Sequence, residues 1–325
     1  MKIVIVGAGA IGGYLGARLA HVGADVTLVA RGPHLVAMRA RGLRVMSPDG
    51  DFESRPNVTG DISSVTSADV IVLGVKAHSL PEIAPQLRPL LTGDTFVVST
   101  QNGIPWWYFE RCGGAFDGLR LECVDPGGTI AAAIPAERVV ASLAYFSTEI
   151  IEPGVIRHVE GNRLSLGEPD GTRSDRCRRL ADALIPAGLR CPVTTRMRHE
   201  IWVKLLGNVA FNPISALTGA TLVQIVRHPE AAQLVREVMA ETEAVAAKLG
   251  IALPISIDQR MAGAEKVGEH KTSMLQDLEA GRPMEIEAVV GAVVELGERL
   301  AMPMPATRAV YACVRLMDEK RKQKH

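Results

Sequence analysis

The sequence predicts an α/β domain built on a doubly wound parallel sheet, followed by an all-α domain. Up to about residue 195, short β-branched runs alternate with helical patterns, and a glycine-rich turn follows the first of these runs. From about residue 196 the apolar residues recur at helical spacing only. The predicted domains are therefore residues 1–195 and 196–325.

The first 31 residues, MKIVIVGAGAIGGYLGARLAHVGADVTLVAR, have the pattern strand, turn, helix, strand. The turn contains GxGxxG, which in this context is typical of a Rossmann-type dinucleotide-binding domain. The first glycine permits the tight turn, the second lets a pyrophosphate approach the backbone, and the third lets the helix pack closely. The alternative is a glycine-rich turn without a ligand. The predicted cofactor-binding loop consists of Gly7, Ala8, Gly9, Ala10, Ile11 and Gly12.

Arg31 follows the second strand at the position that distinguishes the two nicotinamide cofactors. An acidic residue there would bind the ribose hydroxyls of NAD(H) and repel a 2′-phosphate. A guanidinium offers charged donors to that phosphate, so the sequence favours NADP(H), unless Arg31 is simply a surface arginine.

Two further strands are predicted at 69–75 and 95–100, and each is followed by polar residues. Lys76 follows the first, and Gln101-Asn102-Gly103 follows the second. The carboxyl ends of parallel strands flank the ligand crevice of an open sheet. We therefore expect Lys76 to contribute to cofactor binding and Asn102 to both cofactor and substrate binding.

The remainder of the first half is predicted to extend the sheet. Residues 139–150 have the pattern of a strand, and residues 153–167 that of an antiparallel pair turning at 160–162. A charged helix at 174–187 and a short run at 189–194 follow. The segment 104–135 includes four consecutive aromatic residues, 106–109, which fit a lid, a dimer contact or ordinary packing.

Helices are predicted in the second half at 199–211, 228–249, 258–278, 283–301 and 304–319. The first contains Lys204, Asn208 and Asn212, which lie four residues apart and so form one polar stripe on an apolar helix. A buried ammonium is costly without partners, so the stripe indicates either a site or a solvated edge. Ser273 and Glu285 are further polar candidates, expected on separate helices that meet across a bend.

Composition excludes several classes of function. The 36 basic residues balance the 36 acidic ones, so no overall field favours nucleic acid or an anionic membrane. The basic end, 320–324, is predicted to be a solvated tail. Five cysteines without a CxxC pair and eight histidines without ligand spacing predict no metal and a reducing cytoplasm. No signal peptide or membrane anchor is expected.

Several separated motifs together resemble the ketopantoate reductase (2-dehydropantoate 2-reductase) family over nearly the whole chain. They are GAGAIGG, Arg31, VKAHS, TQNG, KLLGNVAFNPISALTG and KTSMLQDLEAGRPMEIE. The resemblance implies NADPH-dependent reduction of 2-dehydropantoate to pantoate, a step of pantothenate biosynthesis, in an active site between a Rossmann-type and a helical domain. It also implies roles for residues of the second half: Lys204 and Glu285 as catalytic residues, with Asn208, Asn212 and Ser273 binding substrate.

Two departures from the family pattern bear on the substrate. The segment after Asn102 is longer than in other members, and ALTGATLVQI lacks an asparagine that some members carry there. A related reductase of a different, bulkier or aromatic 2-oxo acid therefore stays open as an alternative, as does a non-catalytic sensor of NADP(H). A homodimer is a further expectation.

Overall fold

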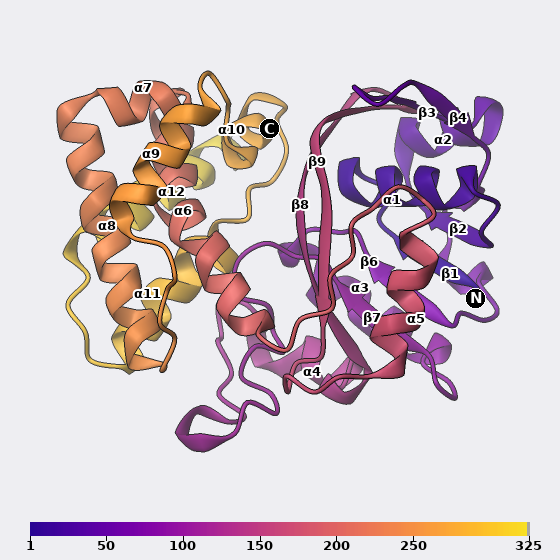
Figure 1. Cartoon of the computed structure of the whole chain (residues 1–325), viewed down its shortest axis with the longest axis horizontal. Helices are drawn as coiled ribbons and strands as arrows, with labels where there is room; N and C mark the ends of the chain where they lie inside the picture. Colours follow the sequence, from indigo (N-terminus) through magenta and orange to yellow (C-terminus); the bar gives the residue numbers. More distant parts are fainter. Residues whose placement is uncertain (324–325) are drawn as a thin grey trace. The chain divides into compact units, whose positions relative to one another are not determined.

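The computed structural model describes residues 1–323, and these residues divide into two compact units (Figure 1). Unit 1 comprises residues 1–101, 106–120 and 127–197. Unit 2 comprises residues 102–105, 121–126 and 198 onward. Two short segments from the first half of the sequence thus belong to the helical unit.

Unit 1 is an α/β unit, as its sequence predicts. Its strands are β1 (Ile3–Val6), β2 (Val26–Val29), β3 (Leu43–Met46), β4 (Phe52–Ser54), β5 (Asn57–Thr59), β6 (Val70–Leu73), β7 (Phe96–Ser99), β8 (Val139–Glu152) and β9 (Val155–Gly167). Its helices are α1 (Ala10–His21), α2 (Gly32–Arg41), α3 (Leu80–Leu87), α4 (Thr129–Ala133) and α5 (Asp175–Leu184). The three short strands β3, β4 and β5 were not predicted.

Within residues 1–323 the strands form one nine-stranded sheet, in the order β4-β3-β9-β8-β7-β6-β1-β2-β5. Strand β1 pairs in parallel with β2 on one side and with β6 on the other, so the strand order reverses at β1. In an open α/β sheet, a reversal of this kind marks the crevice where ligands bind. The prediction of a Rossmann-type doubly wound sheet followed by a helical region is confirmed.

Both faces of this sheet are buried, which explains the continuous apolar runs of its strands. Ile3 and Ile5 join a core cluster with residues of α1 and α5, including Leu15 and Leu180. The alternate residues of β1 project to the opposite face of the sheet and are also buried. Strands covered on both faces become apolar throughout instead of alternating.

The segment 153–167 differs from its predicted antiparallel pair. Strand β9 is continuous and pairs antiparallel with β8, so the turn lies at Pro153-Gly154 and the prediction of a turn at 160–162 was wrong. Gly154 has a φ of 83°, which suits the turn. Gly161 lies where the register of β8 and β9 shifts opposite Phe146, so the glycine belongs to a bulge within one strand.

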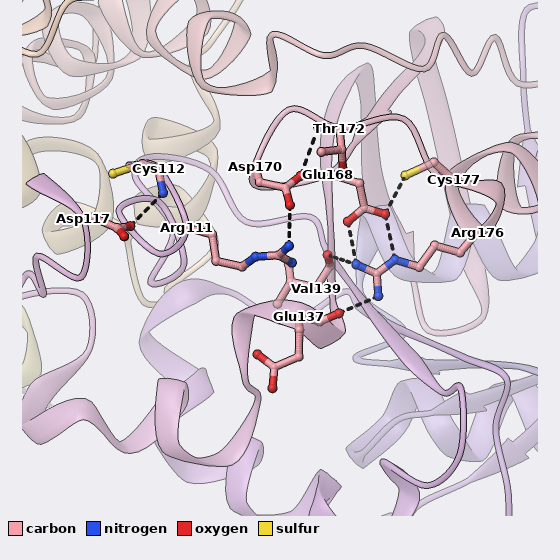
Figure 2. Close-up of polar contacts among 10 residues, drawn as sticks. All are labelled: Arg111, Cys112, Asp117, Glu137, Val139, Glu168, Asp170, Thr172, Arg176 and Cys177. Carbon is pink, nitrogen blue, oxygen red and sulfur yellow. Dashed lines mark hydrogen bonds and ion pairs between the residues drawn. The ribbon is translucent and has the colours of Figure 1, made fainter. Parts of the chain in front are cut away.

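An ionic network fixes the loop after β9 to unit 1 (Figure 2). The buried carboxylate of Glu168 accepts two hydrogen bonds from Arg176, at 2.7 and 2.5 Å, and Arg176 also donates to backbone carbonyls at 137 and 139. The neighbouring Asp170 forms an ion pair of 2.5 Å with Arg111, which lies in the long segment after Asn102. This pair links the segment 106–120 to the rest of unit 1.

Unit 2 is helical, with α6 (Met197–Thr218) entering it from unit 1. The other helices are α7 (Leu222–Arg227), α8 (Pro229–Lys248), α9 (Ile257–Val267), α10 (Ser273–Glu279), α11 (Ala292–Arg299), preceded by a π-helical turn at Glu287–Gly291, and α12 (Pro305–Lys322). The single helix predicted at 258–278 was wrong, because Gly268 ends α9 and Thr272 caps α10.

The basic end of the chain is largely helical. Helix α12 extends to Lys322, and Lys324 lies outside the described residues. The guanidinium of Arg321 donates to Asp318 at 3.0 Å and to the carbonyl of Arg282 at 2.8 Å. The predicted solvated tail was therefore wrong for Arg321, which ties α12 to the segment before the π-helical turn.

Candidate active site

The loop between β1 and α1 has the shape that its glycines predict. A Cβ atom on Gly12 would overlap the carbonyl oxygen of Gly7, so the helix and the turn approach each other too closely for a side chain. A Cβ atom on Gly9 would meet nothing within 4 Å, so the backbone there is open to a ligand. Helix α1 has no capping side chain and no acidic residue in its first turn. These features fit a bound pyrophosphate.

Arg31 and Lys76 lie in unit 1, just beyond the carboxyl ends of β2 and β6. Arg31 is exposed and occupies the N-cap position of α2, one residue after Ala30. Lys76 is partly buried and precedes a short 3₁₀ turn. Both residues therefore lie at the edge of the sheet where a dinucleotide is expected.

Helix α6 carries the predicted polar stripe. Lys204 and Asn208 are partly buried, and Asn212 is buried, among apolar neighbours such as Trp202 and Leu205. Among residues 1–323 neither asparagine side chain has a hydrogen-bond partner. Both amides can therefore donate to and accept hydrogen bonds from a polar ligand.

The ammonium of Lys204 belongs to a chain of polar side chains within unit 2. Lys204 Nζ donates to Asn102 Oδ1 at 2.8 Å, and Asn102 Nδ2 donates to Glu285 Oε2 at 3.3 Å. Residues from three separate parts of the sequence thus meet at one place. The amide group of Asn102 connects a cation and an anion through its two ends.

The pKa of Lys204 is strongly perturbed. Burial lowers this pKa from 10.5 to about 8, the carboxylate of Glu285 opposes the change, and the guanidinium of Arg260 adds to it. An ammonium group whose pKa lies near neutrality is a better proton donor than an ordinary lysine. Perturbed groups of this kind cluster at functional sites.

The loop 102–105 is held against the π-helical turn. Ile104 donates its backbone N–H to the carbonyl of Ala288 at 2.9 Å. Gly103 has a φ of 83°, and a Cβ atom on it would overlap the same carbonyl. The chain can therefore present Asn102 to Lys204 only with glycine at position 103.

Glu285 and Ser273 occupy different surroundings. Glu285 directly precedes the first helical residue, Ile286, so its predicted place within a helix was wrong. Ser273 is the exposed first residue of α10, and no other side chain in the described part of the chain hydrogen-bonds it. The structure thus brings together Lys204, Asn102 and Glu285, while no hydrogen bond among residues 1–323 joins Ser273 to them.

Arg260 was not anticipated from the sequence. It lies on α9, partly buried, and its guanidinium packs against Gly207 of α6, three residues after Lys204. An isolated glycine within a helix often has a packing reason, and Gly207 was the available signal.

The aromatic residues of the long segment after Asn102 are buried. The exposed fractions of Trp106, Trp107, Tyr108 and Phe109 are 6%, 1%, 2% and 3%. The rings of Tyr108 and Phe109 meet edge to face, with centroids 4.7 Å apart. Ordinary packing, one of the three expectations for this segment, accounts for such burial.

The described residues hold no metal-ligand cluster, no disulfide bond and no membrane-spanning helix. Among residues 1–323 no group of three or more histidine, cysteine, aspartate or glutamate side chains could hold a metal ion. None of the five cysteines, which all lie within this range, forms a disulfide bond. No helix in this range is long and apolar enough to cross a membrane.

Comparison with known proteins identifies the family. Residues 3–110 match the model described as "Ketopantoate reductase PanE/ApbA", and residues 196–318 match that for its C-terminal domain. A 2-dehydropantoate 2-reductase from Mesorhizobium japonicum is 52% identical over 97% of both chains. The structure of a candidate ketopantoate reductase from Ralstonia solanacearum MolK2 superimposes with a TM-score of 0.93, at 40% identity, covering 99% of this chain and 98% of that one.

A 2-dehydropantoate 2-reductase from Methylococcus capsulatus gives a TM-score of 0.82 at 33% identity, covering 99% of this chain and 98% of that chain. The sequence relative and both structures match nearly the full length of the chain, and the two family models match residues 3–110 and 196–318 of it. The chain therefore belongs to the ketopantoate reductase family.

Proposed function

We propose that this chain is an NADPH-dependent reductase that converts the ketone of 2-dehydropantoate to the hydroxyl of pantoate, in pantothenate biosynthesis. Membership of the ketopantoate reductase family supports the reaction class, and relatives named 2-dehydropantoate 2-reductase support the substrate. The observation that carries the proposal is the ammonium of Lys204, with its lowered pKa and its hydrogen bond to Asn102.

Lys204 is the general acid in this proposal. The nicotinamide, when bound, would supply a hydride to the ketone carbon, so that the two electrons of the C=O π bond would move to the oxygen. The ammonium group of Lys204 would stabilise the resulting alkoxide by its positive charge and then donate a proton to it. The products are the alcohol, NADP⁺ and a neutral lysine, which regains its proton from solvent.

The other polar residues of unit 2 position the substrate and the lysine. Asn102 orients the ammonium through its 2.8 Å hydrogen bond, and Glu285 holds Asn102 from the other side. Asn208 and Asn212 offer unengaged amides on the same side of α6 for the hydroxyl and carboxylate groups of the substrate. Ser273 is proposed as a substrate contact on its family motif alone.

The cofactor is proposed to be NADP(H). Gly7 to Gly12 would hold the pyrophosphate against the start of α1, and Arg31 would bind the 2′-phosphate. Lys76 and Asn102 are proposed to contact the cofactor as well. The open backbone at Gly9 and the exposed guanidinium of Arg31 support this assignment.

The test is a panel of 2-oxo acids assayed by NADPH oxidation, with the Lys204→Ala variant alongside the parent. The parent should turn over 2-dehydropantoate fastest, and Lys204→Ala should lower kcat by about 10²–10⁴-fold, because general acid catalysis typically contributes that much. NADPH affinity, measured by fluorescence titration, should stay nearly unchanged in the variant.

Other outcomes of the panel have distinct meanings. Faster turnover of an aromatic or bulkier 2-oxo acid would identify a related reductase with a different substrate. NADPH binding without turnover of any 2-oxo acid would identify a sensor. Preserved kcat in Lys204→Ala would remove the lysine from the mechanism.

A homodimer and a cytoplasmic location are also proposed for this chain. Five cysteines without a disulfide bond among them support a reducing compartment. Light scattering coupled to gel filtration measures the mass in solution, and a mass of one chain would exclude the dimer.

A further inference from the structure

The π-helical turn at Glu287–Gly291 is bound to helix α12 by side chains. Tyr311 Oη donates to Glu287 Oε2 at 2.6 Å, and Arg315 Nε of the same helix lies 3.5 Å from Glu287 Oε1. Burial raises the pKa of Tyr311 and the carboxylate of Glu287 raises it further, so the phenol stays protonated and remains the donor. Both oxygens of one carboxylate in the turn are therefore held by α12.

Gly291 makes room for this contact. A Cβ atom on Gly291 would lie 2.5 Å from Glu287 Oε2 and 3.1 Å from Tyr311 Oη. The φ of −56° and ψ of −42° at Gly291 are helical, so the backbone conformation does not require glycine. Glycine is less favourable than alanine within a helix. The contact between Glu287 and Tyr311, which occupies the space of a side chain, gives this glycine its reason.

The contact joins the residues at the two ends of the turn. The N–H of Ala292 donates to the carbonyl of Glu287, five residues earlier, which is the π-helical pattern. A return to the α-helical pattern would remove one residue from the turn and rotate the residues before it by about 100° relative to α11. The carboxylate of Glu287, held over Gly291 by α12, opposes this change.

The same turn holds the neighbours of Lys204. The carbonyl of Ala288 accepts the N–H of Ile104 at 2.9 Å, which fixes the loop that carries Asn102. Glu285 lies two residues before the turn, and its carboxylate accepts from Asn102 at 3.3 Å. A rotation of the turn would therefore move both Asn102 and Glu285 relative to Lys204.

We propose that Tyr311 is a positioning residue of the active site: its hydroxyl group, through Glu287, keeps the π-helical turn in the register that presents Asn102 and Glu285 to Lys204. This role rests on the proposed function, in which Lys204 is the general acid. A purely structural role for Tyr311 would change the stability of the protein and leave the acidity of Lys204 as it is.

The first test is Tyr311→Phe, which removes the hydroxyl group and keeps the ring. Asn102 favours the charged form of Lys204 by a hydrogen bond and Glu285 favours it by charge, while Arg260 disfavours it. Withdrawal of the first two should move the basic limb of kcat to lower pH. The value of kcat should fall about 10–100-fold. The KM for NADPH should stay unchanged, because the cofactor-binding loop belongs to unit 1.

Two measurements report the same change without turnover. NMR titration of isotopically labelled lysine gives the pKa of Lys204, whose signal is identified by its absence from Lys204→Ala. This pKa should be lower in Tyr311→Phe than in the parent. Hydrogen exchange followed by mass spectrometry should show faster exchange at the N–H of Ile104 in the variant. Parent values of both quantities would overturn the proposal.

Thr307→Val is the matched control. Thr307 lies on the same helix α12, and its hydroxyl group donates to Glu241 Oε2 of α8 at 2.6 Å, so the same kind of contact is lost away from the turn. This variant should lose stability but keep the basic limb, the kcat and the exchange rate at Ile104 of the parent. Equal changes in Thr307→Val and Tyr311→Phe would reveal a general effect of a weakened α12 and overturn the proposal.

A second variant displaces the contact while both partners remain. In Gly291→Ala the new methyl group must displace the carboxylate of Glu287, so the same changes should recur although alanine favours the helix. Gly263→Ala adds the same group to α9 in open space and should match the parent. If Tyr311→Phe fails to fold, Gly291→Ala decides the question: an unchanged basic limb and unchanged exchange at Ile104 would contradict the positioning role.

The measurements without substrate separate this proposal from the proposed function. A lowered pKa of Lys204 and faster exchange at Ile104, in a protein that reduces no 2-oxo acid, would refute the reductase and retain the positioning role of Tyr311. Reduction of 2-dehydropantoate with the same kcat and the same pKa of Lys204 in parent and Tyr311→Phe would do the reverse.

Discussion

Lys204 is governed by competing effects that differ in size. Burial has the largest effect on its pKa and favours the neutral amine, the nearby carboxylate of Glu285 favours the ammonium, and Arg260 again favours the amine. The result, a pKa of about 8, leaves the lysine mainly protonated at neutral pH while its proton is less tightly held than usual. Each of the two charged neighbours thus sets part of the acidity of the lysine.

The pH profile of the reduction should report this balance. A general acid works in its protonated form, so kcat should fall as the pH rises through about 8. Glu285→Gln removes the charge that raises the pKa of Lys204, so the basic limb should move to lower pH. Glu279→Gln is the control, because Glu279 pairs with Lys271 at an exposed position. A limb that moves upward or stays fixed in Glu285→Gln would contradict the assigned electrostatics.

Arg31 should determine the preference between nicotinamide cofactors. Its replacement by alanine removes the guanidinium proposed to bind the 2′-phosphate, so kcat/KM for NADPH should fall about 10–100-fold. The value for NADH should change little. Arg39→Ala, at an exposed position on the same helix α2, is the matched control. Equal efficiency of the parent with NADPH and NADH would refute the role of Arg31.

The loop 102–105 determines where Asn102 can stand. Its backbone is fixed by the hydrogen bond from Ile104 to Ala288 and by the positive φ of Gly103. Glu285 precedes the same π-helical turn that carries Ala288. The loop therefore positions Asn102, and the π-helical turn positions Glu285, in the chain of polar side chains that ends at Lys204.

Gly103→Ala should disturb this arrangement. The added Cβ atom would overlap the carbonyl of Ala288, so the loop must shift and carry Asn102 away from Lys204. A displacement of this kind can lower kcat by about 10²-fold. Gly93→Ala is the control, because Gly93 also has a positive φ but faces open space. Its kcat should match the parent, although both variants lose stability through backbone strain. Equal kcat values for the two variants would show that the loop does not position Asn102.

The predictions from sequence succeed and fail at this scale for identifiable reasons. The first βαβ unit and helix α6 have regular apolar patterns, and both were identified, although α6 extends to Thr218 and the helix was predicted to end at residue 211. A glycine can mark a turn, a β-bulge or the end of a helix, and the sequence alone did not distinguish these roles. Gly161 was interpreted as a turn and lies in a bulge, whereas Gly268 ends a helix that was predicted to continue.

Contacts between elements were harder to anticipate. Lys204, Asn208 and Asn212 share one helix, so their spacing alone predicted a common side. The contact of Lys204 with Asn102 joins residues 102 apart, and the sequence did not predict it, although both residues were expected in the active site. The approach of Arg260 to Gly207 depends on the packing of two helices, and an isolated glycine such as Gly207 does not identify the residue that packs against it. The three short strands β3 to β5 lacked the apolar length that identified the others.

At the scale of the whole chain, unit 2 depends on residues that precede it. The chain passes from one unit to the other after residues 101, 105, 120, 126 and 197. Besides Asn102, unit 2 receives the segment 121–126, in which the backbone N–H groups of Glu122 and Cys123 each donate to the carboxylate of Glu295 at 3.0 Å. The helical sequence from 198 onward is therefore incomplete without these two segments.

A fragment of residues 196–325 should be less stable than the same sequence in the full chain. It lacks both N–H donors to Glu295, and hydrogen bonds to a charged group contribute about 1.5–3 kcal/mol each. Hydrogen exchange followed by mass spectrometry should show faster exchange in α11, which carries Glu295, in the fragment than in the full chain. Helix α8, which lies within the fragment, provides the internal reference. Equal protection of α11 in both proteins would show that the segment 121–126 contributes nothing.

The five crossings of the chain between the two units also limit how chimeras of family members can be constructed. A chimera of two relatives with one crossover near residue 196 would combine helix α6, which carries Lys204, from one parent with loop 102–105, which carries Asn102, from the other. In this chimera the proposed proton donor, Lys204, and the amide that orients it, Asn102, would come from different parents. In a chimera, segments 102–105 and 121–126 should therefore come from the same parent as residues 198 onward. Chimeric libraries designed in this way should contain more active members than libraries with a single crossover near residue 196.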